Sequence, residues 1–188
     1  MRHGSRMDPS LTSILCTQCG LCCDGSLFAD VELASRAEAT SLEIMGLVVD
    51  DDDANVALLP QPCAALRGRR CGIYAQRPKC CRTFECRLLQ DVRRGAVSLE
   101  GALEQVAEAS RQIGRTKQLM VQLGQRDRRL ALEELCAEAL SREGASEPDV
   151  DRVRAELAVA MSGLQKLIRK TFLGRGEAAP RDIGSSTG

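Results

Sequence analysis

Cysteines dominate the residues of this chain whose type and spacing could do chemistry. Four of them lie in residues 16–23 with the spacing C-x2-C-x2-C-C. A second segment, residues 63–86, carries five more: Cys63, Cys71, Cys80, Cys81 and Cys86. Backbone loops that close over a metal present thiolates at this x2 spacing, which is why C-x-x-C recurs in zinc and iron–sulfur sites. The pattern therefore predicts a metal site in the first half of the chain.

The alternative is a disulfide framework, and the sequence argues against it. Residues 1–10 contain no apolar segment typical of a secretory signal, and no stretch reaches transmembrane length. We therefore expect a cytoplasmic protein without a membrane contact, where cysteines bind metal more often than they form disulfides. The adjacent pairs Cys22–Cys23 and Cys80–Cys81 point the same way, because neighbouring cysteines bridge only with strain.

Charge and composition narrow the possible partners. The 26 basic and 26 acidic residues balance, so net charge does not indicate nucleic-acid binding. Residues 67–94 are locally basic but lack the aromatic platform on which bases stack, so we expect no nucleic-acid partner. Arginines there suit a different task, which is to offset the negative charge of metal-bound thiolates. Aromatic residues make up only 2% of the chain, so metal ligation would supply stability that a small core lacks.

We expect a mainly α fold, in which a small α+β cysteine-rich metal module precedes a helical bundle or hairpin. The predicted parts are a flexible N-terminus (1–11), the metal module (12–94), a helical region (95–173) and a disordered tail (174–188). Within the module, residues 27–39 predict a short helix, and residues 55–59 predict a strand that Pro60 ends. The helical region is expected to pack on the module or on a protein partner.

The first helix of that region should begin after Ser98, a capping residue, and run to about Leu123. Its apolar residues recur every seven positions: Leu99, Val106, Ile113 and Met120. A second apolar row starts at Leu103 but is interrupted by Ser110 and Lys117. Two further helices are predicted, over residues 127–141 and after a cap at Ser146.

Residues 71–86 read C-G-I-Y-A-Q-R-P-K-C-C-R-T-F-E-C. Together with residues 16–23 and Cys63, this segment resembles the YkgJ-type cysteine-cluster proteins, which are bacterial proteins described as zinc- or iron-chelating domains. The resemblance covers about residues 12–90. It implies eight metal ligands: Cys16, Cys19, Cys22, Cys23, Cys63, Cys71, Cys81 and Cys86. It also implies residues that support those ligands: Tyr74, Arg77, Pro78, Arg82 and Phe84. Cys80 falls at a variable position of the pattern, and Cys136 lies outside it on an apolar helical face, where a buried thiol is expected.

Zinc and iron–sulfur clusters both accept four thiolates. Three cysteines at x2 spacing with a distant fourth are closer to ferredoxin ligation than to the paired knuckles of structural zinc. We therefore expect an iron–sulfur cluster or iron, with zinc as the alternative. The one histidine, His3, lies in the N-terminal segment, which argues against a histidine-ligated catalytic metal.

Eight ligands would close two four-coordinate sites, which favours a metal-binding protein with an accessory, electron-transfer or metal-handling role. Two alternatives stay open at this stage. One is a zinc-binding structural or interaction protein, and the other is a metal-bearing enzyme, or enzyme subunit, that modifies a protein or peptide. A similar cysteine module occurs in flagellin lysine N-methylases, but this chain shows no glycine-rich nucleotide-binding turn after a strand.

Overall fold

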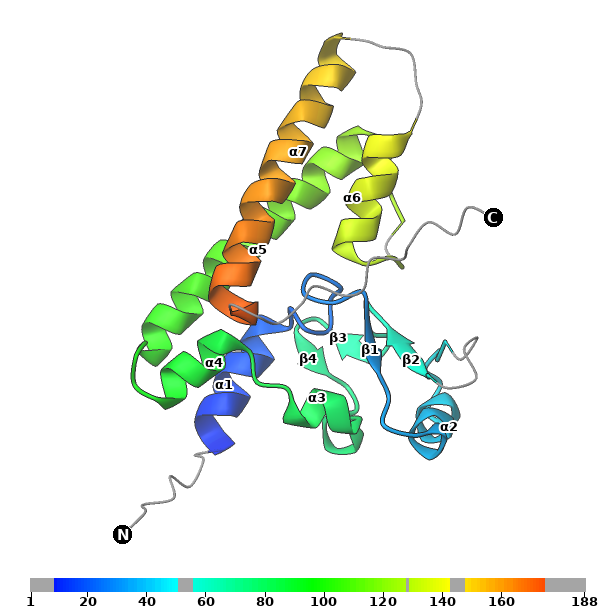
Figure 1. Cartoon of the computed structure of the whole chain (residues 1–188), viewed down its shortest axis with the longest axis vertical. Helices are drawn as coiled ribbons and strands as arrows, with labels where there is room; N and C mark the ends of the chain where they lie inside the picture. The colour runs from blue at the N-terminus through cyan, green and yellow to red at the C-terminus, as the bar shows by residue number, and fades with distance from the viewer. Residues whose placement is uncertain (1–8, 51–55, 128, 143–147, 175–188) are drawn as a thin grey trace.

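The computed structural model describes residues 9–50, 56–127, 129–142 and 148–174 (Figure 1). The fold is mainly α, as predicted, and its sheets are short and two-stranded. The helices are α1 (Pro9–Cys19), α2 (Arg36–Ile44), η1 (Tyr74–Gln76), α3 (Lys79–Thr83), α4 (Arg87–Arg93), α5 (Leu99–Gln122), α6 (Leu132–Ser141), α7 (Pro148–Ile168) and its π-helical continuation η2 (Arg169–Leu173). The strands are β1 (Asp30–Glu32), β2 (Leu58–Pro60), β3 (Leu66–Arg67) and β4 (Arg70–Cys71), paired antiparallel as β1–β2 and β3–β4.

The long helices α5 and α7 lie side by side and organise the larger of two hydrophobic cores, which we call the large core (Figure 1). Helices α1 and α4 pack at one end of this pair, and α6 packs toward the other. Ser98 caps α5 as predicted, because its Oγ accepts a hydrogen bond from Gly101 N at 3.0 Å. The seven-residue repeat also holds, since Val106, Ile113 and Met120 are buried. Leu15, Leu21 and Leu27 join this core, so the cysteine-rich half packs directly on the helices.

A second core, the small core, is separate from the first. Its buried side chains are Leu33, Ala39, Leu42, Leu47, Ala57, Leu59 and Ala65. It lies beneath α2 and the β1–β2 pair, where Val31 stands opposite Leu59. Seven side chains, three of them alanine, bury little apolar surface. This part of the chain therefore depends on another source of stability.

The helix predicted over residues 27–39 is wrong in its position. Residues 30–32 form β1, and α2 begins only at Arg36. Ser35 Oγ accepts from Glu38 N at 3.2 Å, and Glu38 accepts from Ala34 N at 2.9 Å. This pair is similar to a capping box, except that Glu38 accepts from the residue before the cap, and it starts the helix at a defined residue. The start of α2 thus lies inside the range that was predicted to be helical throughout. The strand predicted over 55–59 is found as β2, which begins at Leu58 and includes Pro60, the residue expected to end it; residue 55 lies outside the described residues.

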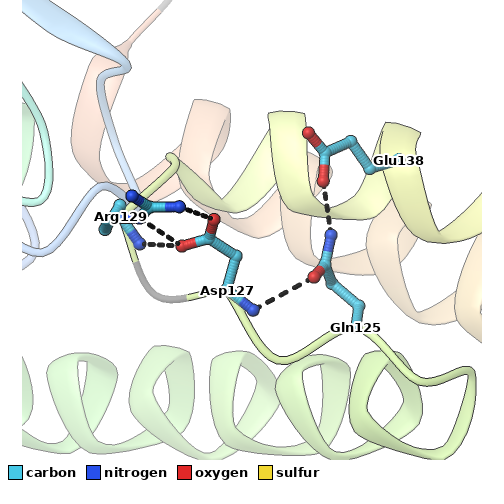
Figure 2. A network of polar contacts seen from close by, with 4 residues as sticks. All are labelled: Gln125, Asp127, Arg129 and Glu138. Carbon is cyan, nitrogen blue, oxygen red and sulfur yellow. Dashed lines mark hydrogen bonds and ion pairs between the residues drawn. The ribbon is translucent and has the colours of Figure 1, made fainter.

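The helix predicted over residues 127–141 begins only at Leu132. A polar network holds the preceding segment out of helical geometry (Figure 2). Asp127 N donates to Gln125 Oε1 at 3.1 Å, and the Arg129 backbone and guanidinium both donate to the Asp127 carboxylate. Gln125 is buried and donates to Glu138 on α6. Side chains that bond to nearby backbone N–H groups compete with helix formation, which explains the late start.

Three predictions fall wholly or partly outside the described residues. They are the flexible N-terminus, of which residues 9–11 lie in α1, the cap at Ser146, and the tail, of which only Gly174 is described. Among the described residues, no helix has the length and apolar character needed to cross a membrane.

Candidate metal centre

The residue 16–23 segment is half helix and half turn. Cys16 and Cys19 lie in the last turn of α1, and Cys22 and Cys23 follow in the turn after it. The helix ends because Gly20 adopts a φ of 73°, a conformation that glycine allows most readily. All ten cysteines are free thiols.

Gly20 also brings the β3–β4 hairpin against the end of α1. A Cβ atom at residue 20 would lie 3.2 Å from Arg69 Cα and 3.3 Å from its carbonyl oxygen. The Arg69 guanidinium donates to Gln18 O at 2.9 Å, which fastens the hairpin to the helix. Cys71 stands on β4 of this hairpin, so the contact carries it toward the residue 20–23 turn.

Backbone hydrogen bonds connect Cys23 to two cysteines of the second segment. Cys63 N donates to Cys23 O at 2.8 Å, and Leu66 N donates to Cys63 O at 2.9 Å. Leu66 pairs with Cys71 across the hairpin. The pKa of Cys23 is raised to about 12, first by burial and then by the nearby charges of Cys63 and Cys71. Cys23 therefore interacts electrostatically with the other two thiols.

Cys81 joins the same neighbourhood from α3. Its pKa is raised first by the hydrogen bond with Cys80, then by burial, and then by the charges of Cys80, Cys23 and Cys63. Helix α3 is held in place by Glu38, whose Oε1 accepts from Lys79 N at 2.7 Å. This contact of Glu38 with α3 joins residues far apart in the chain, so the sequence alone does not show it.

The remaining predicted ligands pack against the large core. Phe84 packs edge-to-face on Phe28 with ring centroids 5.1 Å apart, which brings the chain before Cys86 next to the residue 20–25 turn. Burial raises the pKa of Cys19 to about 12, with Cys86 and Cys16 adding to the effect. Burial likewise raises the pKa of Cys22, and Cys19 and Cys86 are its strongest charged neighbours. The cysteines that pack against the large core are Cys16, Cys19, Cys22 and Cys86.

The eight predicted ligands thus fall into two neighbourhoods. We call Cys16, Cys19, Cys22 and Cys86 the helix-side group, and Cys23, Cys63, Cys71 and Cys81 the hairpin-side group. Neighbours in the chain, Cys22 and Cys23, belong to different groups. As the side chains stand, no three Cys, His, Asp or Glu residues of the described chain are arranged as ligands of one metal ion. The donor set still fits a thiophilic metal, since every member of both groups is a half-buried thiol.

Two cysteines stand outside these groups. Cys80 Sγ lies 4.0 Å from Cys81 Sγ, and their hydrogen bond lowers the pKa of Cys80 to about 7. Cys80 packs against the small core beside the hairpin-side group. Cys136 is buried in the large core on α6, which agrees with the apolar helical face predicted for it.

Among the predicted supporting residues, Arg77 acts electrostatically on the thiols. Its guanidinium carbon lies 3.6 Å from the Tyr74 ring centroid, and its Nε donates to Tyr74 O at 3.1 Å. Burial raises the pKa values of Cys16 and Cys23, and the Arg77 charge lowers both. One arginine therefore acts on both groups. The Arg82 side chain is exposed and forms no hydrogen bond or ion pair with any described residue.

We expect Arg77→Ala to weaken metal retention by about ten- to a hundredfold, as loss of a residue that supports metal ligands typically does. Arg77→Lys should restore only part of the loss, because lysine keeps the charge without the planar fork that stacks on Tyr74. Retention in the presence of a competing chelator measures the effect. Arg82→Ala is the matched control and should retain metal like the unaltered chain. Equal losses at both positions would contradict a special role for Arg77.

The model of the CxxCxxCC family, described as "Putative zinc- or iron-chelating domain", matches residues 15–112. The chain belongs to this family. The CxxCxxCC match takes in both cysteine segments and extends through the first half of α5, past the module boundary predicted after residue 94. No curated protein and no solved structure matches the chain.

Metal-free protein should become less stable in alkali. Burial raises the pKa values of Cys19 and Cys23 from the ordinary value of 9.0 to about 12 in the folded state. The stabilisation is then complete below pH 9 and is lost as pH rises from about 9 toward 12, because the unfolded chain ionises first. Thermal unfolding followed by circular dichroism at a series of pH values should show this decline in the metal-free form. The double variant Cys19→Ala/Cys23→Ala should decline less steeply; an equal slope would assign the effect to other groups.

Proposed function

We propose that this chain binds metal at two sites, one formed by the helix-side group and one by the hairpin-side group. The observation that carries the proposal is the division of the thiols: each group supplies four sulfurs, and each sulfur set comes from chain segments that the fold brings together. Four thiolates complete the coordination of zinc or of an iron–sulfur cluster. The family match supports chelation of zinc or iron by this region.

Either group would have to move its side chains to close on a metal. Rotation about the Cα–Cβ bond moves a cysteine sulfur between staggered positions while the backbone stays fixed. Burial removes the water that would stabilise a thiolate, and neighbouring thiolates would repel one another, so the metal-free groups stay protonated. Metal binding would release those protons and supply the opposite charge.

The cysteine spacing favours an iron–sulfur cluster over zinc. A bound cluster would supply one-electron transfer, and a bound zinc ion would supply structural stability. We propose an accessory, electron-transfer or metal-handling role for the chain in the cytoplasm. We further propose that the helical region binds a protein partner.

Anaerobic purification with analysis of iron, zinc and acid-labile sulfide tests this proposal. We expect iron and sulfide in comparable amounts, with visible absorption that bleaches on reduction. If the protein contained zinc and no sulfide, the proposal of two metal sites would stand with zinc as a structural metal. The proposed electron-transfer role would then be wrong. A chain that takes up neither metal, even after reconstitution, would overturn the proposal.

A further inference from the structure

A cavity of about 280 Å³ opens beside the helix-side group. It lies between the residue 20–24 turn, the β3–β4 hairpin and the middle of α5, and Cys19 forms part of its wall. Ligand pockets in proteins typically measure about 300–1,000 Å³, so this cavity suits a molecule at the small end of that range. The metal-binding proposal gives it no role.

The cavity carries charges of both signs. Asp24 lies on one wall, and Arg69 and Lys117 line others. Both cations act electrostatically on Asp24, yet neither forms an ion pair with it among the described residues. The Asp24 carboxylate instead accepts a hydrogen bond from Ser26 N at 2.9 Å. Opposite charges are therefore held apart across an open space.

The positive wall is held in position by contacts of its own. Arg69 donates to Gln18 O at 2.9 Å and to Ser110 Oγ at 3.4 Å, which fixes the guanidinium at the cavity edge. A guanidinium has five N–H donors, so donors remain for a ligand. Lys117 is exposed on α5, and its ammonium forms no hydrogen bond with a described residue.

Helix α5 places a glycine, Gly114, in the wall of this cavity. Ser110, Gly114 and Lys117 follow one another at helical spacing and occupy the face where the apolar row starting at Leu103 is interrupted. A Cβ atom at Gly114 would meet no atom within 4 Å, so the structure has room for a side chain there. Glycine within a helix is less stable than alanine. The glycine thus leaves space where stability alone would favour filling it.

We propose that this cavity binds a small zwitterion, that is, an amino acid or a similar molecule with one carboxylate and one ammonium group. The carboxylate would lie against Arg69 and Lys117, and the ammonium against Asp24. A simple amine would be repelled by the two cations, and a simple anion would be attracted by them but would leave Asp24 without a positive partner. A zwitterion would place an opposite charge against each wall, and the planar guanidinium of Arg69 suits a carboxylate.

The test uses the full chain as purified and ligand-observed NMR with each of the twenty protein amino acids, acetate and ethylammonium. We expect at least one amino acid to bind at least tenfold more tightly than acetate and ethylammonium. Gly114→Leu, which fills the cavity, should weaken that binding at least tenfold. Gly163→Leu is the matched control, since Gly163 is also a helical glycine with nothing within 4 Å but lies on α7, away from the cavity.

Lys117→Gln should also weaken amino-acid binding while leaving ethylammonium binding no weaker, because it removes one of the two cations and keeps Asp24. Metal content measured on the same samples separates this result from the fate of the metal sites. No binding by any amino acid, binding of acetate as tight as the best amino acid, or equal weakening by Gly114→Leu and Gly163→Leu would each overturn the proposal.

Discussion

Removal of the bound metal is expected to unfold the small core while the α5–α7 helices stay folded. The small core buries seven apolar side chains, Cys63 of the hairpin-side group packs against it, and Cys71 of the same group lies on β4. Structural zinc contributes about 10–16 kcal/mol in zinc-finger peptides, which is comparable to the whole stability of a typical domain, about 5–15 kcal/mol. A site of this strength would decide whether so small a core forms at all.

Hydrogen exchange with and without a strong chelator measures this effect residue by residue. Amide protection in β1, β2, β3, β4 and α2 should disappear on metal removal. Protection in α5 and α7 should persist, because Val106, Leu157 and Leu164 lie in the large core. The large core is thus an internal control within the same chain. Retained protection in the β1–β2 pair after verified metal loss would show that the small core is stable by itself.

Serine substitutions at two neighbouring residues should each empty a different metal site. Cys22→Ser is expected to empty the helix-side site and leave the hairpin-side site filled, and Cys23→Ser should do the reverse. Each variant should therefore retain about half of the metal, since a missing thiolate opens a four-coordinate site. Combining Cys22→Ser with Cys86→Ser should cause no further loss, because both residues belong to one group.

Metal content per chain, with the visible or near-ultraviolet spectrum of each variant, checks these outcomes. Cys136→Ser serves as the control and should keep full metal content, since Cys136 lies buried on α6. Its buried hydroxyl is expected to cost about 1–3 kcal/mol of stability without a partner. If Cys22→Ser and Cys86→Ser each removed half of the metal and the pair removed all of it, the two residues would belong to different sites. The proposed grouping would then be wrong.

The sequence predicted the helical half well because local signals governed it. Ser98 at the start of α5 and the seven-residue repeat through Val106, Ile113 and Met120 are short-range patterns, and a short-range pattern decides a long helix. The start of α6 was missed because Asp127 reads as a helical residue until its contacts with Gln125 and Arg129 are known.

The cysteine-rich half was harder to predict because long-range contacts shape it. The sequence shows the motif but not that Cys63 N bonds to Cys23 O, or that Phe84 packs on Phe28. These contacts join residues far apart in the chain, and they decide which thiols become neighbours. Spacing alone grouped residues 16–23 as one unit, whereas the fold divides that unit between two neighbourhoods.

The position of Cys22 and Cys23 in different groups also sets an order of assembly. The hairpin-side group runs from Cys23 to Cys81, and the helix-side group runs from Cys16 to Cys86, so one loop is nested inside the other. Closing the inner loop shortens the flexible chain that the outer loop must close, which lowers its entropic cost. A ribosome also releases Cys81 before Cys86. We therefore expect the inner site to fill first, so that a half-loaded chain holds its metal on the hairpin side.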